Sequence, residues 1–354
     1  MPEDIRKNFS SDNVVRVCPE VMQALMEAND GSASAYGNDA YTSALDARFG
    51  EVFESEVAVF PIVTGTASNS LALSALVSPF GSVVCDESAH IQNDEGGAPE
   101  FFMHGAKIVT IPSGNGLMQP SALSHTINEK KAAGLLAPPI QALSLTQASE
   151  WGLVYQTDHL TSLSKVAHAE KLTVHLDGAR LGNAIASLGC TPAETTWKAG
   201  VDVLTFGGTK NGAMAAEAVV FFLNDRTRPF VENFKRRIKR SGHLWSKHRF
   251  LSAQLLALLK NNLWLRNAQH ANIMAQRLST GLQALPNATL PYATQSNEIF
   301  IALPEHLVQK LEKGGFGFYR WPTPAGVDGT MIRLVTSFDT REKDVDALLD
   351  YIAT

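Results

Sequence analysis

The chain has 354 residues, of which 45% are hydrophobic and 18% charged, and its formal net charge is −5. This composition is typical of a globular protein long enough for two domains, and the negative charge disfavours general binding to nucleic acid or to an anionic membrane surface. Apolar runs such as AVVFFL at 218–223 are too short to span a bilayer. The three cysteines have no metal-binding or redox spacing, which is typical of a reducing compartment, so we expect a cytoplasmic protein.

Between about residues 50 and 225, short apolar segments alternate with helical patterns. The segments predicted to be strands are VAVFPIV, SVVCDES, AKIVTIP, QALSLTQ, KLTVHLDG, VDVLTFGG and EAVVFFL, and those predicted to be helices include GTASNSLALSALVS and GNAIASLG. Strands that are apolar on both faces and separated by helices or loops are typical of a mostly parallel sheet covered on both sides.

After about residue 244 the pattern changes to that of a long amphipathic helix, which is interrupted near Asn261–Asn262. From about residue 296, the strand-like EIFIALP and MIRLVTSF alternate with the helical PEHLVQKLEKG and REKDVDALLDYI. We therefore expect an α/β protein with an N-terminal segment (1–15), a large domain (16–245), and a connecting helix with a small C-terminal α/β domain (246–354).

Polar residues follow several of the predicted strands. LTVHLD ends in Asp177, VDVLTFGG leads to Lys210, and SVVCDES is followed by His90. In open α/β sheets, ligands bind beyond the carboxyl ends of the strands, where these residues would meet. A Thr-Gly-Thr turn at 64–66 joins a strand to a helix, and such a turn presents free N–H groups and hydroxyls to a phosphate.

An aspartate, a lysine, a histidine and a phosphate-binding turn together indicate pyridoxal 5′-phosphate (PLP). Lys210 would bind the cofactor aldehyde covalently, His90 would stack on the ring, and the surrounding glycines would leave room for it. Asp177 would keep the pyridine nitrogen protonated through a charge-assisted hydrogen bond of about 1.5–3 kcal/mol.

Each residue alone has an ordinary explanation as a loop lysine, a turn aspartate, a loop histidine or a helix cap. Their joint order and spacing favours the cofactor site. A dinucleotide-binding oxidoreductase is disfavoured because no G-x-G-x-x-G follows a strand. A catalytically silent cofactor-binding or structural protein is disfavoured because every expected polar position is filled. The basic stretch at 226–249 is interpreted as a solvated helix face with one or two residues available for phosphate, not as a nucleic-acid site.

Beyond these patterns, the chain resembles the L-threonine aldolases, which belong to the β-eliminating lyase group of aspartate-aminotransferase-type PLP enzymes, and within them the low-specificity branch. The motifs that carry the resemblance run over essentially the whole chain and are FSSDN, YGNDAYT, TGTASN, SAHIQNDEGGAPEFF, HLDGARLGNA, TKNG and IRLVTSFDT. The resemblance implies an aspartate-aminotransferase-like fold. It also implies retro-aldol cleavage of L-threonine, L-allo-threonine and related β-hydroxy-α-amino acids to glycine and an aldehyde. Another PLP-dependent lyase acting by β-elimination, or a transaminase, would use the same lysine and aspartate.

The resemblance also implies residue roles. Lys210, Asp177 and His90 match the cofactor residues named above. The further matches are Gly65, Thr66 and Ala67 for the phosphate, Ser11, Arg180 and Arg333 for the substrate carboxylate, and Tyr36, Lys239 and Lys247 for positions that reach a neighbouring subunit's site. The last group implies a homo-oligomer, a tetramer built from dimers that share active sites. No metal site is expected.

The sequence departs from the family in one loop. Many threonine aldolases carry a second active-site histidine after the strand that matches QALSLTQ, whereas this chain reads TQASEWG there, with Ser149 or Glu150 near that place. The substrate β-hydroxyl would then depend on His90 or on Glu150 as its proton acceptor. We therefore expect weak discrimination between the threo and erythro forms.

Overall fold

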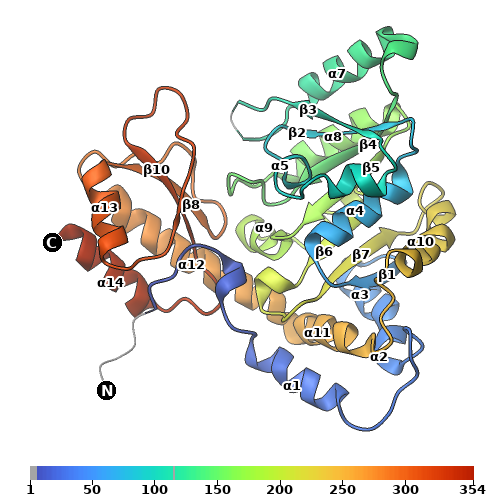
Figure 1. Ribbon diagram of the computed structural model, residues 1–354, viewed down its shortest axis with the longest axis horizontal. Helices are drawn as coiled ribbons and strands as arrows, with labels where there is room; N and C mark the ends of the chain where they lie inside the picture. Colours follow the sequence, from blue (N-terminus) through green and yellow to red (C-terminus); the bar gives the residue numbers. More distant parts are fainter. Residues whose placement is uncertain (1–5, 115) are drawn as a thin grey trace.

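The large sheet carries the elements around which the molecule is built. The computed structural model describes residues 6–114 and 116–354, and within these residues a seven-stranded sheet has the order β1-β7-β6-β5-β4-β2-β3 (Figure 1). The strands are β1 (Val57–Ile62), β2 (Ser82–Asp86), β3 (Lys107–Ile111), β4 (Ile140–Thr146), β5 (Thr173–Gly178), β6 (Val203–Gly207) and β7 (Glu217–Phe222). Strands β2 to β6 pair in parallel, while β7 is antiparallel to both β1 and β6. The predicted strands and the mostly parallel sheet are confirmed.

Both faces of this sheet are buried under helices, as the apolar strands predict. Alternate residues of β7 enter separate cores, Val219 with Phe221 on one face and Val220 with Phe222 on the other. The helices of the large sheet are α1 (Pro19–Ala28), α2 (Ala40–Ser43), α3 (Leu45–Phe53), α4 (Gly65–Leu76), α5 (His90–Asn93), α6 (Ala98–Phe102), α7 (Pro120–Ala132), α8 (Thr157–Ala169), α9 (Leu181–Leu188) and α10 (Arg228–Arg240).

Helix α10 contains most of the basic stretch. Phe234 and Ile238 are buried one turn apart, whereas Lys235, Arg236 and Arg240 are exposed. The interpretation of this stretch as a solvated helix face is therefore confirmed.

The long C-terminal helix is interrupted where the sequence predicts. Helix α11 (Arg249–Leu259) and helix α12 (Leu263–Gln283) are separated by a short 3-10 turn in which Asn261 and Asn262 have φ angles of 51° and 54°. Asparagine tolerates this left-handed conformation better than most residues do. Helix α12 then leads from the large sheet to a second, smaller layer (Figure 1).

The smaller layer has its own sheet and core. Its elements are β8 (Glu298–Leu303), α13 (Glu305–Lys313), β9 (Tyr319–Arg320), β10 (Thr330–Val335) and α14 (Glu342–Ala353), with sheet order β8-β10-β9. The N-terminal segment joins this layer, because the Phe9 N–H donates to Gly317 and the Phe9 carbonyl accepts from Val335, both at 2.7 Å. The domain boundaries given above stay predictions. No helix among the described residues is long and apolar enough to cross a membrane.

The glycines near Lys210 have a different role from the one expected. A Cβ atom at Gly207 would overlap the backbone of Ala179, and one at Gly208 would overlap the carbonyl of Ala216. The lack of a side chain at these glycines therefore lets neighbouring backbone segments pack closely against the end of β6.

Because backbone atoms cannot move aside as a flexible side chain can, Gly207→Ala should lower the free energy of unfolding by about 1–3 kcal/mol through overpacking. Gly189→Ala is the matched control, since no atom lies within 4 Å of its Cβ position and only the strain of its φ of 64° remains, about 1 kcal/mol. Urea unfolding of both variants measures the difference. Equal destabilisation would contradict the packing explanation.

Candidate active site

A cavity of about 470 Å³ lies at the carboxyl ends of the central strands. Thr146 at the end of β4, Asp177 near the end of β5 and Thr205 of β6 contribute to its lining. Seven of the residues predicted for the site meet in this cavity and are Lys210, His90, Asp177, Glu150, Gly65, Thr66 and Arg180.

Lys210 lies in the short connection between β6 and the antiparallel β7, within a single 3-10 turn at Thr209–Asn211. Asp177 is buried at the end of the neighbouring β5. One carboxylate oxygen of Asp177 accepts the Ala179 N–H at 3.0 Å, and the other accepts the Asn69 side-chain amide at 2.7 Å. The aspartate is thus held rigidly at the cavity wall.

A chain of hydrogen bonds links Asp177 to the histidine. The amide of Asn69 also donates to Glu95 at 2.9 Å, and the same Glu95 oxygen lies 2.9 Å from Nδ1 of His90. The hydrogen bond to Glu95 raises the pKa of His90, against the opposing effect of burial. The ring nitrogen directed at Glu95 is therefore fixed, so that Nε2 is the nitrogen left for other partners.

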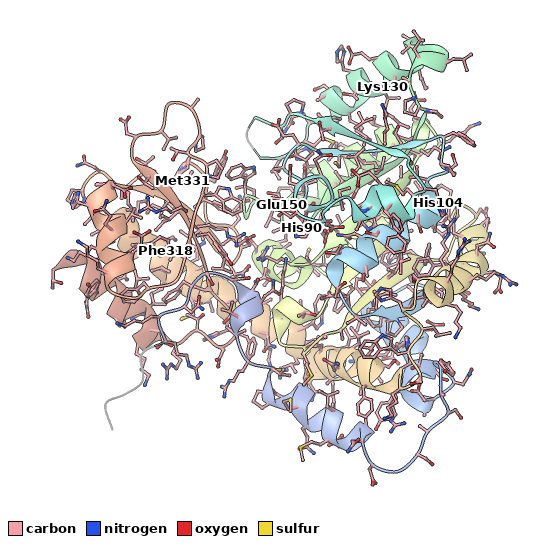
Figure 2. The ribbon with its side chains drawn as sticks, viewed as in Figure 1. His90, His104, Lys130, Glu150, Phe318 and Met331 are labelled. Carbon is pink, nitrogen blue, oxygen red and sulfur yellow. The ribbon has the colours of Figure 1, made fainter. Side chains whose placement is uncertain are left out.

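Glu150 lies beside His90, as both labelled residues show in Figure 2, and its carboxylate accepts the His90 backbone N–H at 3.2 Å. Burial raises the pKa of Glu150 to about 7. A carboxyl group with this pKa exchanges its proton near neutral pH, which suits general acid–base chemistry.

Glu217, at the start of β7, is a second buried carboxyl group in the cavity. It accepts the N–H of Gly208 at 3.0 Å and that of Thr209 at 3.3 Å, and burial raises its pKa to about 7. Its hydrogen bonds hold the backbone just before Lys210.

The phosphate turn predicted from the sequence forms the start of α4. Thr64 caps this helix by accepting the Ala67 N–H at 3.2 Å. The N–H groups of Gly65 and Thr66 belong to the first turn of a helix, which has no intrahelical acceptors, and both residues line the cavity. Ala67 is outside the lining, and its predicted contact with phosphate stays a prediction.

Arg180 is buried at the cavity wall and surrounded by carboxylates. Its Nε and Nη2 atoms donate to the two oxygens of Asp12 at 2.8 and 3.0 Å, and its Nη1 atom lies 3.2 Å from Glu298. Burial alone would lower the pKa of Arg180, but Asp12 and Glu298 together raise it. The pKa of Asp12 is lowered despite its burial, chiefly by Arg180 and Lys210.

Arg333 of β10 is outside the cavity lining, but it approaches the same Glu298 as Arg180 does. Its Nη1 atom lies 3.7 Å from a carboxylate oxygen of Glu298. Its Nη2 atom donates to the Ser10 carbonyl, and its guanidinium lies over the rings of Tyr319 and Trp321. Ser11, the adjacent residue, caps the 3-10 turn at Asp12–Val14. The predicted carboxylate-binding residues are thus near one another.

Residues 8–304 match the beta-eliminating lyase family. The chain belongs to this family. It is 41% identical to the low specificity L-threonine aldolase of Pseudomonas sp. (strain NCIMB 10558) over 98% of this chain and 96% of that protein. It is also 40% identical to the low specificity L-threonine aldolase of Pseudomonas aeruginosa, over 95% of this chain and 94% of that protein.

Among solved structures, the threonine aldolase of Leishmania major superposes with a TM-score of 0.90 and 28% identity, over 98% of this chain and 99% of that one. The resemblance to low-specificity L-threonine aldolases and the aspartate-aminotransferase-like fold class are both confirmed.

In this beta-eliminating lyase, the residues outside the cavity lining also include the three predicted to reach a neighbouring subunit's site, Tyr36, Lys239 and Lys247. Tyr36, half exposed, has the Lys239 ammonium 4.8 Å above its ring and donates its N–H to Ser246, the residue before Lys247. The three residues therefore gather in one surface region.

Sequence reasoning missed five buried residues of the site, which are Asp12, Asn69, Glu95, Glu217 and Glu298. Asp12, Asn69 and Glu95 do stand inside motifs already singled out, FSSDN, TGTASN and SAHIQNDEGG. Glu217 and Glu298 each begin an apolar strand, and a carboxylate at a strand's first position ordinarily faces water. Among the described residues, no three His, Cys, Asp or Glu side chains are grouped as a metal site requires.

Glu95→Gln should lower the pKa of His90, because a neutral amide no longer stabilises the protonated ring. The titration of the His90 Cε1–H resonance by NMR measures this shift. Glu170→Gln, which removes a carboxylate paired with Lys131 elsewhere, is the control. An unchanged His90 titration in Glu95→Gln would contradict the role given to this hydrogen bond.

Proposed function

We propose that the protein is a PLP-dependent aldolase that cleaves L-threonine, L-allo-threonine and related β-hydroxy-α-amino acids to glycine and an aldehyde. One observation carries the proposal: Lys210, Asp177 and the first turn of α4 converge on a single cavity from three different strand ends. The names of the Pseudomonas relatives support the choice of substrate.

The residues present fit PLP. Lys210 would hold the cofactor covalently, Asp177 would bind the pyridine nitrogen, and the free N–H groups of Gly65 and Thr66 would bind the phosphate. Asp177 is buried and accepts two hydrogen bonds, which fix its carboxylate at the place where the ring nitrogen would bind. When bound, PLP supplies an electron sink for the carbon–carbon bond that breaks.

The remaining side chains would act on the substrate itself. The guanidinium groups of Arg180 and Arg333 would hold the carboxylate and so orient the bond to be cleaved. The ionised Glu150 would accept the β-hydroxyl proton, with Nε2 of His90 as the alternative acceptor. Because burial raises its pKa to about 7, Glu150 can exchange its proton near neutral pH and can return the proton afterwards.

We further propose a homo-oligomer, a tetramer built from dimers. The lysine and arginine side chains that line the cavity within the described residues are Lys210 and Arg180, and Arg180 is occupied by carboxylates. The phosphate end therefore lacks a committed cation from its own chain. The exposed Lys239 and Lys247 are suited to supply one to a neighbouring subunit. Location in the cytoplasm stays a prediction.

Lys210→Ala should abolish the visible absorbance of the bound cofactor and nearly all threonine cleavage, because among the described residues Lys210 is the one lysine in the cavity lining. The measurements are the absorption spectrum and acetaldehyde release from L-threonine. The wild type also decides between the alternatives. If it releases ammonia from serine, or transfers an amino group to a 2-oxo acid, faster than it releases acetaldehyde from L-threonine, the β-eliminating or transaminating alternative is favoured.

L-threonine and L-allo-threonine should both be cleaved, because one carboxylate acceptor discriminates less than a pair of fixed groups. Cleavage should rise as the pH increases through about 7, where Glu150 ionises, and Glu150→Gln should lose this rise. Initial rates on the four threonine stereoisomers from about pH 5.5 to about pH 9 test both points. A preference above about a hundredfold between the L-forms, about 2.7 kcal/mol, would refute the relaxed site.

A further inference from the structure

Glu298 is a buried carboxylate that lies against both arginines predicted to bind the substrate carboxylate. One of its oxygens faces Nη1 of Arg180 at 3.2 Å, and the other faces Nη1 of Arg333 at 3.7 Å. Its side chain is 1% exposed. Arg180 follows β5 of the large sheet, whereas Arg333 lies in β10 of the small sheet, and Glu298 is the group that they share.

The arrangement of donors shows where a further carboxylate would bind. Asp12 already occupies the Nε and Nη2 edge of Arg180 with two hydrogen bonds, and it is held there by the Asn297 amide at 3.0 Å. Arg180 therefore has Nη1 and the second N–H of Nη2 left to offer. Of these, Glu298 contacts Nη1, together with the guanidinium of Arg333.

Glu298 itself is poorly satisfied in this position. Neither of its buried oxygens forms a hydrogen bond within the described residues, so the 3.2 Å approach to Arg180 is an ion pair without good hydrogen-bond direction. The buried Nε of Arg333 is also without a partner there. Buried polar atoms are ordinarily hydrogen-bonded, and a set of unpaired donors and acceptors indicates a place for a ligand.

The charges of this group also bear on the binding of a substrate carboxylate. Arg180 and Arg333 carry two positive charges, and Asp12 with Glu298 carries two negative charges, so the buried group is neutral before any substrate enters. A substrate carboxylate adds an uncompensated negative charge next to Glu298, and like charges at such short range in a low-dielectric site are costly.

We infer that Glu298 sets the affinity of the site for carboxylates, because it occupies the guanidinium donors that the substrate carboxylate needs. The inference rests on the proposed function, which assigns that carboxylate to Arg180 and Arg333. Glu298 competes with the substrate and thereby keeps binding weak. A purely structural tie between the two sheets would have no such effect on ligand affinity.

The test measures binding of 3-hydroxybutyrate, which is threonine without its amino group, to the holoenzyme by isothermal titration calorimetry. Glu298→Gln removes the charge and keeps the shape, and it should bind this probe roughly tenfold more tightly than the wild type (about 1.4 kcal/mol). Glu298→Asp moves the charge away from the arginines by the length of one methylene, and its affinity for the probe should lie between those of Glu298→Gln and the wild type. For L-threonine cleavage, the change should appear in KM and not in kcat.

Glu312→Gln is the matched control, since it removes an exposed carboxylate of the same small layer that pairs with Arg320. It should bind the probe as the wild type does. If Glu298→Gln fails to fold, the comparison of Glu298→Asp with the wild type decides the question. Unchanged or weaker binding in the Glu298 variants, or no binding in any protein, would overturn the inference. Failure of the wild type to cleave threonine would instead refute the proposed function, while the order of probe affinities would still decide the role of Glu298.

Discussion

The site depends on the need to neutralise one buried guanidinium. Arg180 cannot lose its proton under ordinary conditions, so its burial requires carboxylate partners with good geometry. Asp12 provides them from the N-terminal segment and Glu298 from the small sheet. Two distant segments are thereby brought to Arg180, just after the end of β5 at the cavity wall. Loss of one partner from such a buried pair typically costs about 3–5 kcal/mol, so these segments are expected to unfold and refold together.

Acidic groups dominate the cavity, which is unusual for a site that is to hold a phosphate and a carboxylate. Burial raises the pKa of both Glu150 and Glu217 to about 7, and the nearby Asp177 and Glu298 carboxylates add to this effect for Glu150. The two groups differ in their hydrogen bonds within the described residues, because Glu217 accepts two backbone N–H groups just before Lys210 whereas Glu150 accepts one, that of His90. Glu217 therefore suits a positioning role, and Glu150 has oxygen lone pairs left for a substrate.

The sequence alone predicts the large sheet, the break at Asn261–Asn262 and the central residues Lys210, Asp177 and His90. The sheet and the break are confirmed, and the three residues line one cavity. Each of these features depends on local information: an apolar run, a pair of turn-forming residues, or a polar residue directly after a strand. Parallel topology then places the strand ends together without further information. The family motifs add roles for Arg180 and Arg333 that no local pattern carries.

The missed residues are missed for a physical reason. Asn69 matters because it bridges Asp177 and Glu95, and Glu298 because it faces two arginines on other segments. Such partners are set by packing between elements far apart in the chain, and a single sequence contains no period or spacing that reveals them. The glycines at 207 and 208 illustrate the same limit. The sequence shows that the chain can turn freely there, but it does not show which backbone segments approach these glycines.

The antiparallel orientation of β7 has a consequence for how the lysine is presented. Most strands of this sheet return to it through a helix, but β6 and β7 are joined by a hairpin connection, with Gly207 opposite Glu217 in the register. Lys210 is therefore anchored at both ends by neighbouring strands in the interior of the sheet. Contacts of short sequence separation form early and cost little loop entropy. The reactive amine thus belongs to a part of the chain that assembles locally. The backbone amides of β6 and β7, the strands on either side of it, should be among the slowest to exchange with solvent hydrogen.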